Sequence, residues 1–507
     1  MSVWRTLSQV ARYVSGEAAE DDVPMMESLA SFQRHFEEDG GADAAGKIER
    51  KVAAEDKTGK SAAEKWEVFS SLDLSKYVGK DVLSVASLPI WLFEPTTTLQ
   101  RIGEIFEHGH RLLVLADNEP DPAMRMAYVA AFAVANYAGS ERTLKPFNPI
   151  LGETFECVGG GDDEGDGSSS NNRFYLLAEQ VSHHPPIGAA CAECPAHYQY
   201  AITSAPRTKF HGNSVSIFPA NHTEIRLKKH PGEIYRIRSP TTTVNSLIVG
   251  GGMWTDTHGT LNLWTDGGGA ECVLNFEECG LFGEGRYEVA GTVRLANDAA
   301  PALAVCGMWN EGLDAVACDA DGNPINDADP VPLWRVVPAD VDAAKVHKFN
   351  LSPFVERQNH ASSVGALAPP DDKDSSAAYG AVLASDSRLR PDRLALERGD
   401  LASAARWKVA LEERQRAERR RRDAEGGSYA PRFFRCRRGG GGGGDVKEDP
   451  RDAVPYDADR AVFRARVAAA LAAPGTSPFD GSWVERAAFA PWQFADETDS
   501  SACAATA

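Results

Sequence analysis

The chain has 507 residues, enough for one large domain or for two to three ordinary ones. Its hydrophobic fraction of 43% and its charged fraction of 25% are those of a soluble globular protein. The net charge of −20 argues against a nucleic-acid-binding protein. No apolar run reaches the ~18 residues of a membrane span, and the start lacks a secretory leader pattern, so we expect a cytosolic protein.

Cysteine usage gives little indication of disulfides or of a metal. Nine cysteines are scattered along the chain, and an odd number is not typical of a disulfide framework. Cys191 and Cys194 form one C-x-x-C pair, but the nearest further ligands, His197, Cys272 and Cys279, lack a recognised zinc spacing. We therefore expect neither a metal nor another cofactor.

The N-terminal residues 1–65 are expected to form an extension. Apolar residues recur at helical spacing between Val3 and Val14, which predicts a short amphipathic helix. That helix could pack on its own domain or lie on a membrane surface, and the pattern does not choose between the two. Residues 37–65, rich in Ala, Gly and charged side chains, are typical of a linker.

The next part of the chain is predicted to be mainly helical. Residues 66–78 carry large apolar side chains in an amphipathic segment, and residues 88–94 are expected to be extended between two prolines. Helical periodicity then runs over residues 99–137. Pro120 and Pro122 interrupt it, which predicts two helices.

From about Phe155 to Arg335 the pattern changes to short apolar or alternating runs with turn residues between them. Many short strands without intervening helices favour an antiparallel barrel or sandwich. The clearest runs are residues 174–178, 198–202, 214–218, 223–227, 233–237, 246–249, 260–264, 271–276, 287–295 and 302–309. The acidic, polar residues 159–172 predict a disordered hairpin loop.

The last third of the chain returns to helical patterning, most clearly over residues 401–422. A poly-Gly run at 439–444 is typical of a flexible linker, and residues 496–507 are expected to be a disordered tail. Between Arg406 and Arg438, twelve Arg and Lys residues stand against five Asp and Glu, a local charge of +7 in an acidic protein. Such a basic segment requires a partner or another explanation.

The most unusual motif is Glu179-Gln-Val-Ser-His183-His184-Pro-Pro186. The two prolines stiffen the backbone around His184, so the two imidazoles are presented from an extended segment. A pair of histidines can bind a metal, move protons or hold a phosphate. Alone, such a pair is more often a surface or core feature than a site.

A second motif is Lys145-Pro-Phe-Asn148-Pro-Ile-Leu-Gly-Glu153. Its two prolines hold Lys145 and Asn148 in one geometry. Lysine suits a phosphate and asparagine adds neutral hydrogen bonds, although a lone Lys-Pro pair is usually a solvated turn.

A third motif lies in the predicted helix at 401–422. Lys408, Glu412 and Arg416 are spaced i, i+4 and i+8 and share one helix face. They could form an exposed set of ion pairs, or two cations for a phosphate with a carboxylate that orients them and accepts a sugar hydroxyl.

Together the three motifs resemble those of the oxysterol-binding-protein-related family of lipid carriers. Residues 179–186 match its fingerprint, and residues 145–153 are similar to its Lys-Pro-(Leu/Phe)-Asn-Pro-x-Leu-Gly-Glu motif. The matches to its C-terminal helix are Lys408, Glu412, Gln415 and Arg416. Residues 79–84 depart from the family's Gly-Lys-Asp-Leu-Ser by one extra residue.

The resemblance covers about residues 66–495 and implies a β-dominated α+β fold. That fold is an incomplete antiparallel β-barrel with a hydrophobic lipid tunnel, an N-terminal lid and flanking helices. The implied parts are a lid at 66–88, helices at 99–138, a barrel at 155–335 and a C-terminal helical subdomain at 340–495.

The resemblance also implies a lipid-transfer protein rather than an enzyme. It would bind phosphatidylinositol 4-phosphate and exchange it for a sterol or phosphatidylserine, as a cytoplasmic monomer peripheral on endoplasmic reticulum, Golgi or plasma membrane contacts. The implied head-group residues are Lys145, Asn148, His183, His184, Lys408, Glu412 and Arg416. The implied lid backbone is Leu83, Ser84, Val85, Ala86, Ser87 and Leu88. Two alternatives stay open: a lipid sensor or membrane-contact scaffold without transport, and an enzyme that uses the histidine pair.

Overall fold

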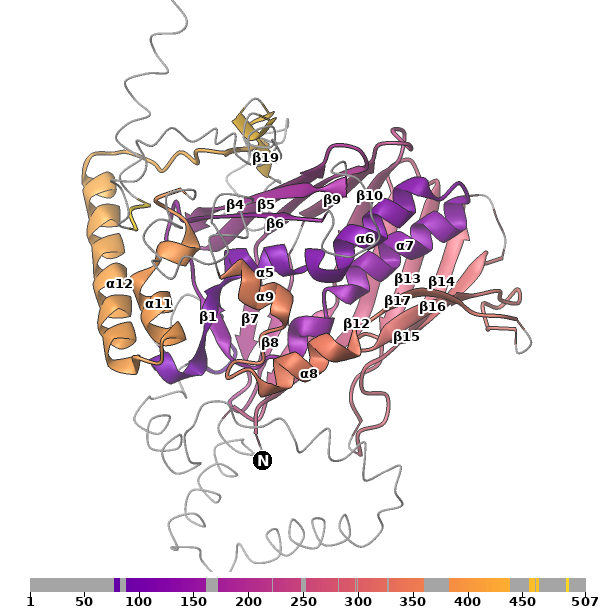
Figure 1. The fold of residues 1–507 in the computed structure, drawn as a ribbon, viewed down its shortest axis with the longest axis horizontal. Helices are drawn as coiled ribbons and strands as arrows, with labels where there is room; N and C mark the ends of the chain where they lie inside the picture. The colour runs from indigo at the N-terminus through magenta and orange to yellow at the C-terminus, as the bar shows by residue number, and fades with distance from the viewer. Residues whose placement is uncertain are drawn as a thin grey trace, which may run out of the picture.

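A large sheet with helices packed against it dominates the molecule (Figure 1). Helices α6 (Phe106–Asn118) and α7 (Pro122–Ala135) lie across the sheet, and helix α12 (Leu401–Ala424) stands at one end. The computed structural model describes residues 77–82, 88–160, 172–220, 222–247, 252–280, 282–296, 298, 300–325, 328–359, 383–437, 456–460, 462–464 and 489–491.

The main sheet has fifteen strands within the described residues, and every pairing in it is antiparallel. Its first strands are β3 (Thr154–Gly159), β4 (Phe174–His183), β5 (Pro186–Cys194), β6 (Tyr198–Ser204), β7 (Arg207–Phe210), β8 (Val215–Phe218), β9 (His222–Leu227) and β10 (Ile234–Arg238). The others are β11 (Thr241–Asn245), β12 (Trp254–Thr265), β13 (Ala270–Phe276), β14 (Glu288–Leu295), β15 (Leu303–Met308), β16 (Gly312–Val316) and β17 (Val331–Arg335).

The strand order runs β17-β16-β15-β14-β13-β12-β10-β9-β6-β5-β4-β3, and β11, β8 and β7 branch from β12. In the part of the chain that the structure describes, no pairing joins β3 to β17, so the sheet is not closed. This confirms the expected β-dominated fold with an open antiparallel sheet and flanking helices.

The remaining elements lie around the sheet. Strands β1 (Phe93–Thr97) and β2 (Lys145–Phe147) pair in parallel, and β18 (Phe434–Cys436) pairs with β19 (Tyr456–Ala458). The other helices are α5 (Thr98–Glu104), α8 (Pro338–Val346), α9 (Pro353–Gln358) and α11 (Pro391–Glu397). Short 3-10 segments are η3 (Ile90–Leu92), η4 (Ala138–Glu141) and η9 (Ser387–Leu389).

The strands form where apolar side chains alternate with polar ones. In β13, the buried residues Cys272, Leu274 and Phe276 alternate with the exposed Glu271 and Asn275. A period of two places every second side chain on one face, so this pattern buries one face of the strand against the helices.

Strands β4 and β5 are buried on both faces. Ala190 and Ala192 of β5 belong to the core that includes α6 and α7, whereas Cys191 packs in a second cluster with Phe433 and Phe434. The C-terminal segment therefore covers the outer face of the sheet beside the histidine motif, which lies in the β4–β5 hairpin.

The helix predictions are largely confirmed. The helical run breaks at Pro120 and Pro122 as expected, and the Asp121 side chain caps α7 by accepting the N–H three residues on. A further break at Ile105 separates α5 from α6. Helix α12 agrees with its expected bounds to within two residues at its end, and Asp400 caps its start in the same way.

Two local predictions are wrong. The strand expected at residues 246–249 is not found at residues 246 and 247, because β11 ends at Asn245 and Ser246 has a left-handed φ of 57°; residues 248 and 249 lie outside the described residues. The segment expected to be extended, residues 88–94, contains the 3-10 turn η3 before β1 begins.

Several expectations fall on residues outside those described. They are the extension at 1–65, most of the amphipathic segment at 66–78, most of the loop at 159–172, the poly-Gly run at 439–444 and the tail at 496–507.

Candidate functional site

Two lysines from distant motifs meet over one aromatic ring. Lys145 begins β2, beside Phe93 of β1, and Lys408 lies on the inward face of α12. The Lys145 Nζ is 5.8 Å from the centre of the Phe93 ring, and the Lys408 Nζ is 5.4 Å from it. The ring attracts both ammonium groups through its quadrupole, although the two cations repel one another.

Burial and the neighbouring charge of Lys408 lower the pKa of Lys145 to about 8, against a smaller opposite effect of Glu412. Two neighbouring ammonium groups that are poorly hydrated destabilise the protein unless nearby anions balance their charge. An anion bound beside the two lysines would relieve this cost.

Glu412 orients the cations of α12. Its Oε1 lies 2.7 Å from the Lys408 Nζ, and its Oε2 lies 3.4 Å from the Arg416 Nη2. Lys408 is buried, whereas the Arg416 side chain is 60% exposed. Lys408, Glu412 and Arg416 therefore form consecutive ion pairs along one face of α12. Lys408 is the buried end, beside Phe93, and Arg416 is the exposed end.

The histidine pair lies at the turn between β4 and β5. The rings of His183 and His184 meet edge to face with centres 4.7 Å apart. The Nδ1 of His183 lies 3.0 Å from the carbonyl oxygen of Pro149, which joins this motif to the Lys145–Glu153 motif. Because a carbonyl only accepts, Nδ1 carries the proton in the neutral ring and Nε2 is left as an acceptor.

Burial and then the His184 ring lower the pKa of His183 to about 4; the hydrogen bond to the Pro149 carbonyl raises it in part, and Arg390 and Arg419 lower it by smaller amounts. The pKa of His184 is also lowered, by burial and by Arg419. Both shifts favour neutral rings at pH 7. An anion at the site would favour their protonation.

A buried arginine, Arg390, holds the loop that connects the lysine pair to the histidine pair. Arg390 donates through Nη1 to the Asn148 carbonyl at 3.0 Å and to Glu153 Oε2 at 2.9 Å, and it pairs with Asp392 at 2.8 Å. The same Glu153 oxygen accepts the Ile150 N–H at 2.9 Å. Asn148 thus contacts Arg390 through its backbone carbonyl. Arg390 and Glu153 were not identified as positioning residues from the sequence.

The first residue of the histidine motif is an anchor rather than a ligand. Glu179 is fully buried and accepts from the Tyr429 hydroxyl at 2.7 Å and from the backbone N–H groups of Arg432 and Phe433, each at 2.9 Å. Within the hairpin, Ser182 donates to the Pro185 carbonyl at 2.8 Å. Part of the motif therefore stabilises the fold around the two histidines.

The C-x-x-C pair cannot act as a unit. Cys191 and Cys194 are three residues apart on β5, so their side chains point to opposite faces and belong to different core clusters. Burial raises the pKa of both thiols. Within the described part of the chain, no three His, Cys, Asp or Glu side chains gather as metal ligands would.

The expected lid residues Leu83, Ser84, Val85, Ala86 and Ser87 lie outside the described residues, whereas Leu88 packs beside the Phe93 cluster.

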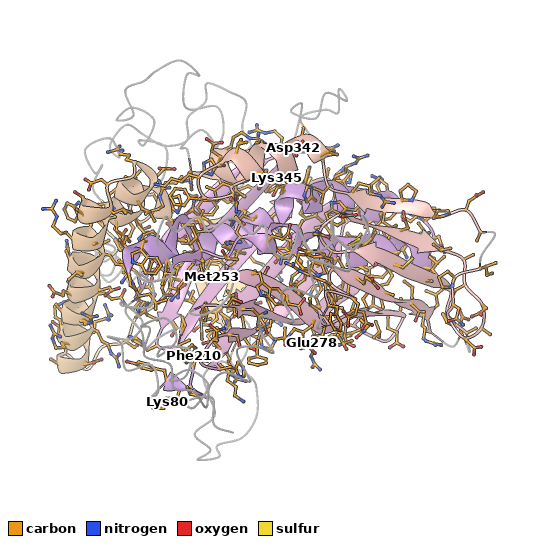
Figure 2. The ribbon with its side chains drawn as sticks, turned by 90° about the horizontal axis from the view of Figure 1, so that it is seen from below. Lys80, Phe210, Met253, Glu278, Asp342 and Lys345 are labelled. Carbon is orange, nitrogen blue, oxygen red and sulfur yellow. The ribbon has the colours of Figure 1, made fainter. Side chains whose placement is uncertain are left out.

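The segment before those residues is attached to β7. The Gly79 N–H donates to the Phe210 carbonyl at 2.8 Å, and the Phe210 N–H donates to the Lys80 carbonyl at 3.2 Å. Thr208 Oγ1 donates to Asp81 and accepts the Val82 N–H. Figure 2 shows Lys80 beside Phe210, on the side of the molecule opposite Asp342 and Lys345 of α8.

No helix among the described residues is long and apolar enough to cross a bilayer.

The chain is similar to a known protein family. The sequence model described as Oxysterol-binding protein matches residues 70–452. Oxysterol-binding protein-related protein 3B of Arabidopsis thaliana is 37% identical over 424 residues, which are 83% of this chain and 82% of that relative. Oxysterol-binding protein-related protein 3C of the same plant is 40% identical over 363 residues, 71% of this chain and 72% of that relative.

Solved structures agree with the sequence comparison. The Osh1 ORD domain in complex with cholesterol superposes with a TM-score of 0.63 at 26% identity, over 86% of this chain and 99% of that one. The Osh3 ORD of Saccharomyces cerevisiae in complex with PI(4)P gives a TM-score of 0.56 at 28% identity, over 72% of this chain and 86% of that one.

Proposed function

Because the chain belongs to the oxysterol-binding protein family, we propose that it is a lipid-transfer protein. It binds phosphatidylinositol 4-phosphate and exchanges that lipid for a sterol or phosphatidylserine between membranes, as a cytoplasmic monomer peripheral on endoplasmic reticulum, Golgi or plasma membrane contacts. The two similar solved structures, one with cholesterol and one with PI(4)P, support a pair of such ligands.

The observation that carries the proposal is the pair of lysines over Phe93 in a protein of net charge −20. Burial and then the charge of Lys408 lower the pKa of Lys145, and Glu412 offsets only part of this effect, so an anionic group that binds beside the two lysines would stabilise their charged forms. A sterol, which carries no anionic group, makes no use of this cluster.

The lipid's tails and its head group are bound by different physical effects. Removing tail surface from water contributes ~25 cal/mol per Å², so roughly 500 Å² gives about 12 kcal/mol before ordering costs. The phosphates cannot be buried without partners. We assign them to Lys145, Lys408, Arg416 and the histidine pair, with Asn148 and Glu412 near the inositol hydroxyls and the lid backbone at residues 83–88 closing over them.

Extraction from liposomes tests the proposal. Purified protein is offered phosphatidylinositol 4-phosphate, a sterol and phosphatidylserine in separate vesicles, and lipid in the soluble fraction is measured. We expect the protein to take up the phosphoinositide and also either the sterol or phosphatidylserine. Binding to vesicles without any extraction would favour a lipid sensor or scaffold instead.

A double substitution, Lys408→Ala with Arg416→Ala, separates the two ligands. Phosphoinositide extraction should be lost and sterol uptake retained, because a sterol has no anionic head group that needs these cations. An equal loss of both lipids would contradict the split roles. A metal assay on the same preparation addresses the enzyme alternative.

A further inference from the structure

A short piece of the chain near its C-terminus, residues 489–491, lies beside helix α12 (Figure 1, yellow). Its first residue, Phe489, is 9% exposed and belongs to a small apolar cluster. The members of that cluster are Phe489, Ile150, Leu389 and Leu411. The cluster therefore joins α12, which carries Leu411, to the loop of the Lys145–Glu153 motif, which carries Ile150.

The 489–491 segment is held from two sides. The Ala490 N–H donates to the Ala384 carbonyl at 2.8 Å, which attaches the segment to the body of the domain. On the other side, a Cβ atom added at Gly152 would lie 3.1 Å from the Pro491 carbonyl oxygen, so the segment also fits closely against the loop. Phe489 is therefore fixed in position by contacts of its neighbours as well as by its own burial.

The contact of this cluster with α12 is the last buried one along the helix. The buried residues of α12 are Ala404, Lys408 and Leu411. Leu411 follows Lys408 by three residues and so lies one turn further on nearly the same face. Because no residue of α12 beyond Leu411 is buried, the packing of Phe489 on Leu411 holds the helix close to the lysine that lies over Phe93.

The contact with the loop lies equally close to the other lysine. Ile150 follows Lys145 by five residues, and its N–H donates to Glu153 Oε2 at 2.9 Å, so the loop is rigid at this point. The two ammonium groups lie 5.8 and 5.4 Å from the centre of the Phe93 ring, one brought by the loop and the other by the helix. The cluster around Phe489 thus spans the two elements that bring the lysines together.

We propose that Phe489 is a positioning residue for the anion site formed by Lys145 and Lys408. It packs between helix and loop and keeps them at the separation at which both ammonium groups lie over Phe93. A binding site needs such support, because a displacement of about 0.5 Å already loosens it. The inference rests on the proposed function, and it assigns a role to a residue beyond the range 70–452 that the family model matches.

The test compares Phe489→Ala with Phe463→Ala in the full chain. Phe463 is 7% exposed and packs against Tyr175 with ring centres 5.8 Å apart, in a cluster that contains no residue of α12. It is therefore a matched control for the loss of a buried phenylalanine. Each protein is offered vesicles of phosphatidylcholine with phosphatidylinositol 4-phosphate, and separately vesicles of phosphatidylcholine with cholesterol.

Phe489→Ala should weaken phosphoinositide uptake about tenfold and change sterol uptake less than about twofold, because the cavity left by the ring lets α12 shift away from the loop. Phe463→Ala should leave the ratio of the two uptakes as it is in the unsubstituted protein. Phe489→Leu keeps part of the apolar contact, so it should act in the same direction as Phe489→Ala with a smaller effect. The leucine variant decides the test if the alanine variant does not fold.

The pKa of Lys145 distinguishes positioning from a merely structural role. In the ligand-free protein, NMR titration should give Lys145 a pKa above about 8 in Phe489→Ala, because a displaced α12 removes part of the burial and of the Lys408 charge that lower this pKa. Phe463→Ala should leave the pKa of Lys145 unchanged.

Unchanged phosphoinositide uptake by the folded Phe489 variants, with an unchanged pKa of Lys145, would overturn the inference and leave the proposed function intact. An equal loss of both lipids without a change in that pKa would also overturn it, because Phe489 would then serve stability alone. If the unsubstituted protein takes up no phosphoinositide, the proposed function fails. The pKa comparison would still decide whether Phe489 positions the lysine pair.

Discussion

The Nδ1 of His183 donates a hydrogen bond to the carbonyl oxygen of Pro149 across 3.0 Å, and this contact joins two motifs that are 34 residues apart in the sequence. It also fixes which nitrogen of the ring carries the proton. The Nε2 of neutral His183 has a lone pair, so the ring can donate to a phosphate through Nε2 only after it takes up a second proton.

We therefore expect phosphoinositide binding to take up a proton at His183. The pKa of His183 in the ligand-free protein is about 4, and a nearby phosphate raises this pKa. The lipid-bound protein therefore holds more protons than the ligand-free protein. Binding should weaken as the pH rises from the ligand-free pKa to the lipid-bound pKa. Calorimetry in two buffers of different ionisation enthalpy measures the uptake. His183→Gln is the control, because the lipid phosphate also titrates. Equal proton uptake by the two proteins would rule out this role.

Lys145→Met should stabilise the ligand-free protein while abolishing phosphoinositide uptake. The folded pKa of about 8 lies below the ordinary 10.5, so the unfolded chain binds more protons between these values. The destabilisation by Lys145 is full below pH 8 and disappears as pH rises to 10.5. At pH 7 the gain should be on the order of 1–2 kcal/mol, allowing for partial solvent screening.

Urea unfolding at pH 7 and at pH 10.5 checks this prediction. The difference between Lys145→Met and the unsubstituted protein should shrink at the higher pH. A variant less stable than the parent at pH 7 would mean that packing of the lysine stem outweighs its charge.

Glu179→Gln should destabilise the fold by about 1–3 kcal/mol. The carboxylate accepts from Tyr429, Arg432 and Phe433, and an amide would turn its NH2 group toward one of these donors. Denaturant unfolding measures the loss, with the exposed Glu413→Gln as control. Similar stability of the two variants would show that Glu179 is not the anchor inferred here.

Thr208→Val should loosen the segment before the expected lid. The substitution removes the hydrogen bonds of Thr208 to Asp81 and to the Val82 N–H, whereas the backbone contacts of Gly79 remain. Amide hydrogen exchange at Val82 should become about fivefold faster, because one net hydrogen bond is worth ~1 kcal/mol.

Thr242→Val is the control for that experiment. Thr242 lies in β11, which pairs with β8. Its hydroxyl forms a hydrogen bond with Thr257 and not with residues 79–82. Equal exchange at Val82 in the two variants would show that Thr208 does not hold the segment in place.

The local pattern of apolar and polar residues determined much of the secondary structure of this protein. The alternation in β13 reflects side chains that must face a core, so the sequence was sufficient to predict that strand. The three motifs contain residues that the structure brings together, at Phe93 and at the Pro149 carbonyl. Ser246 was mispredicted because its left-handed φ depends on the turn rather than on the apolar run around it.

Only the tertiary structure decided what the motif residues do. Glu179 and Glu153 lie in the sequence motifs without a predicted role, and their contacts with the C-terminal segment and with Arg390 make them anchors. The lowered pKa of His183 depends first on burial and on the adjacent His184 ring, and then on Arg390 and Arg419, which are more than 200 residues away in the sequence. Sequence periodicity records which face of an element is buried, whereas charge and protonation depend on which distant side chains that face meets.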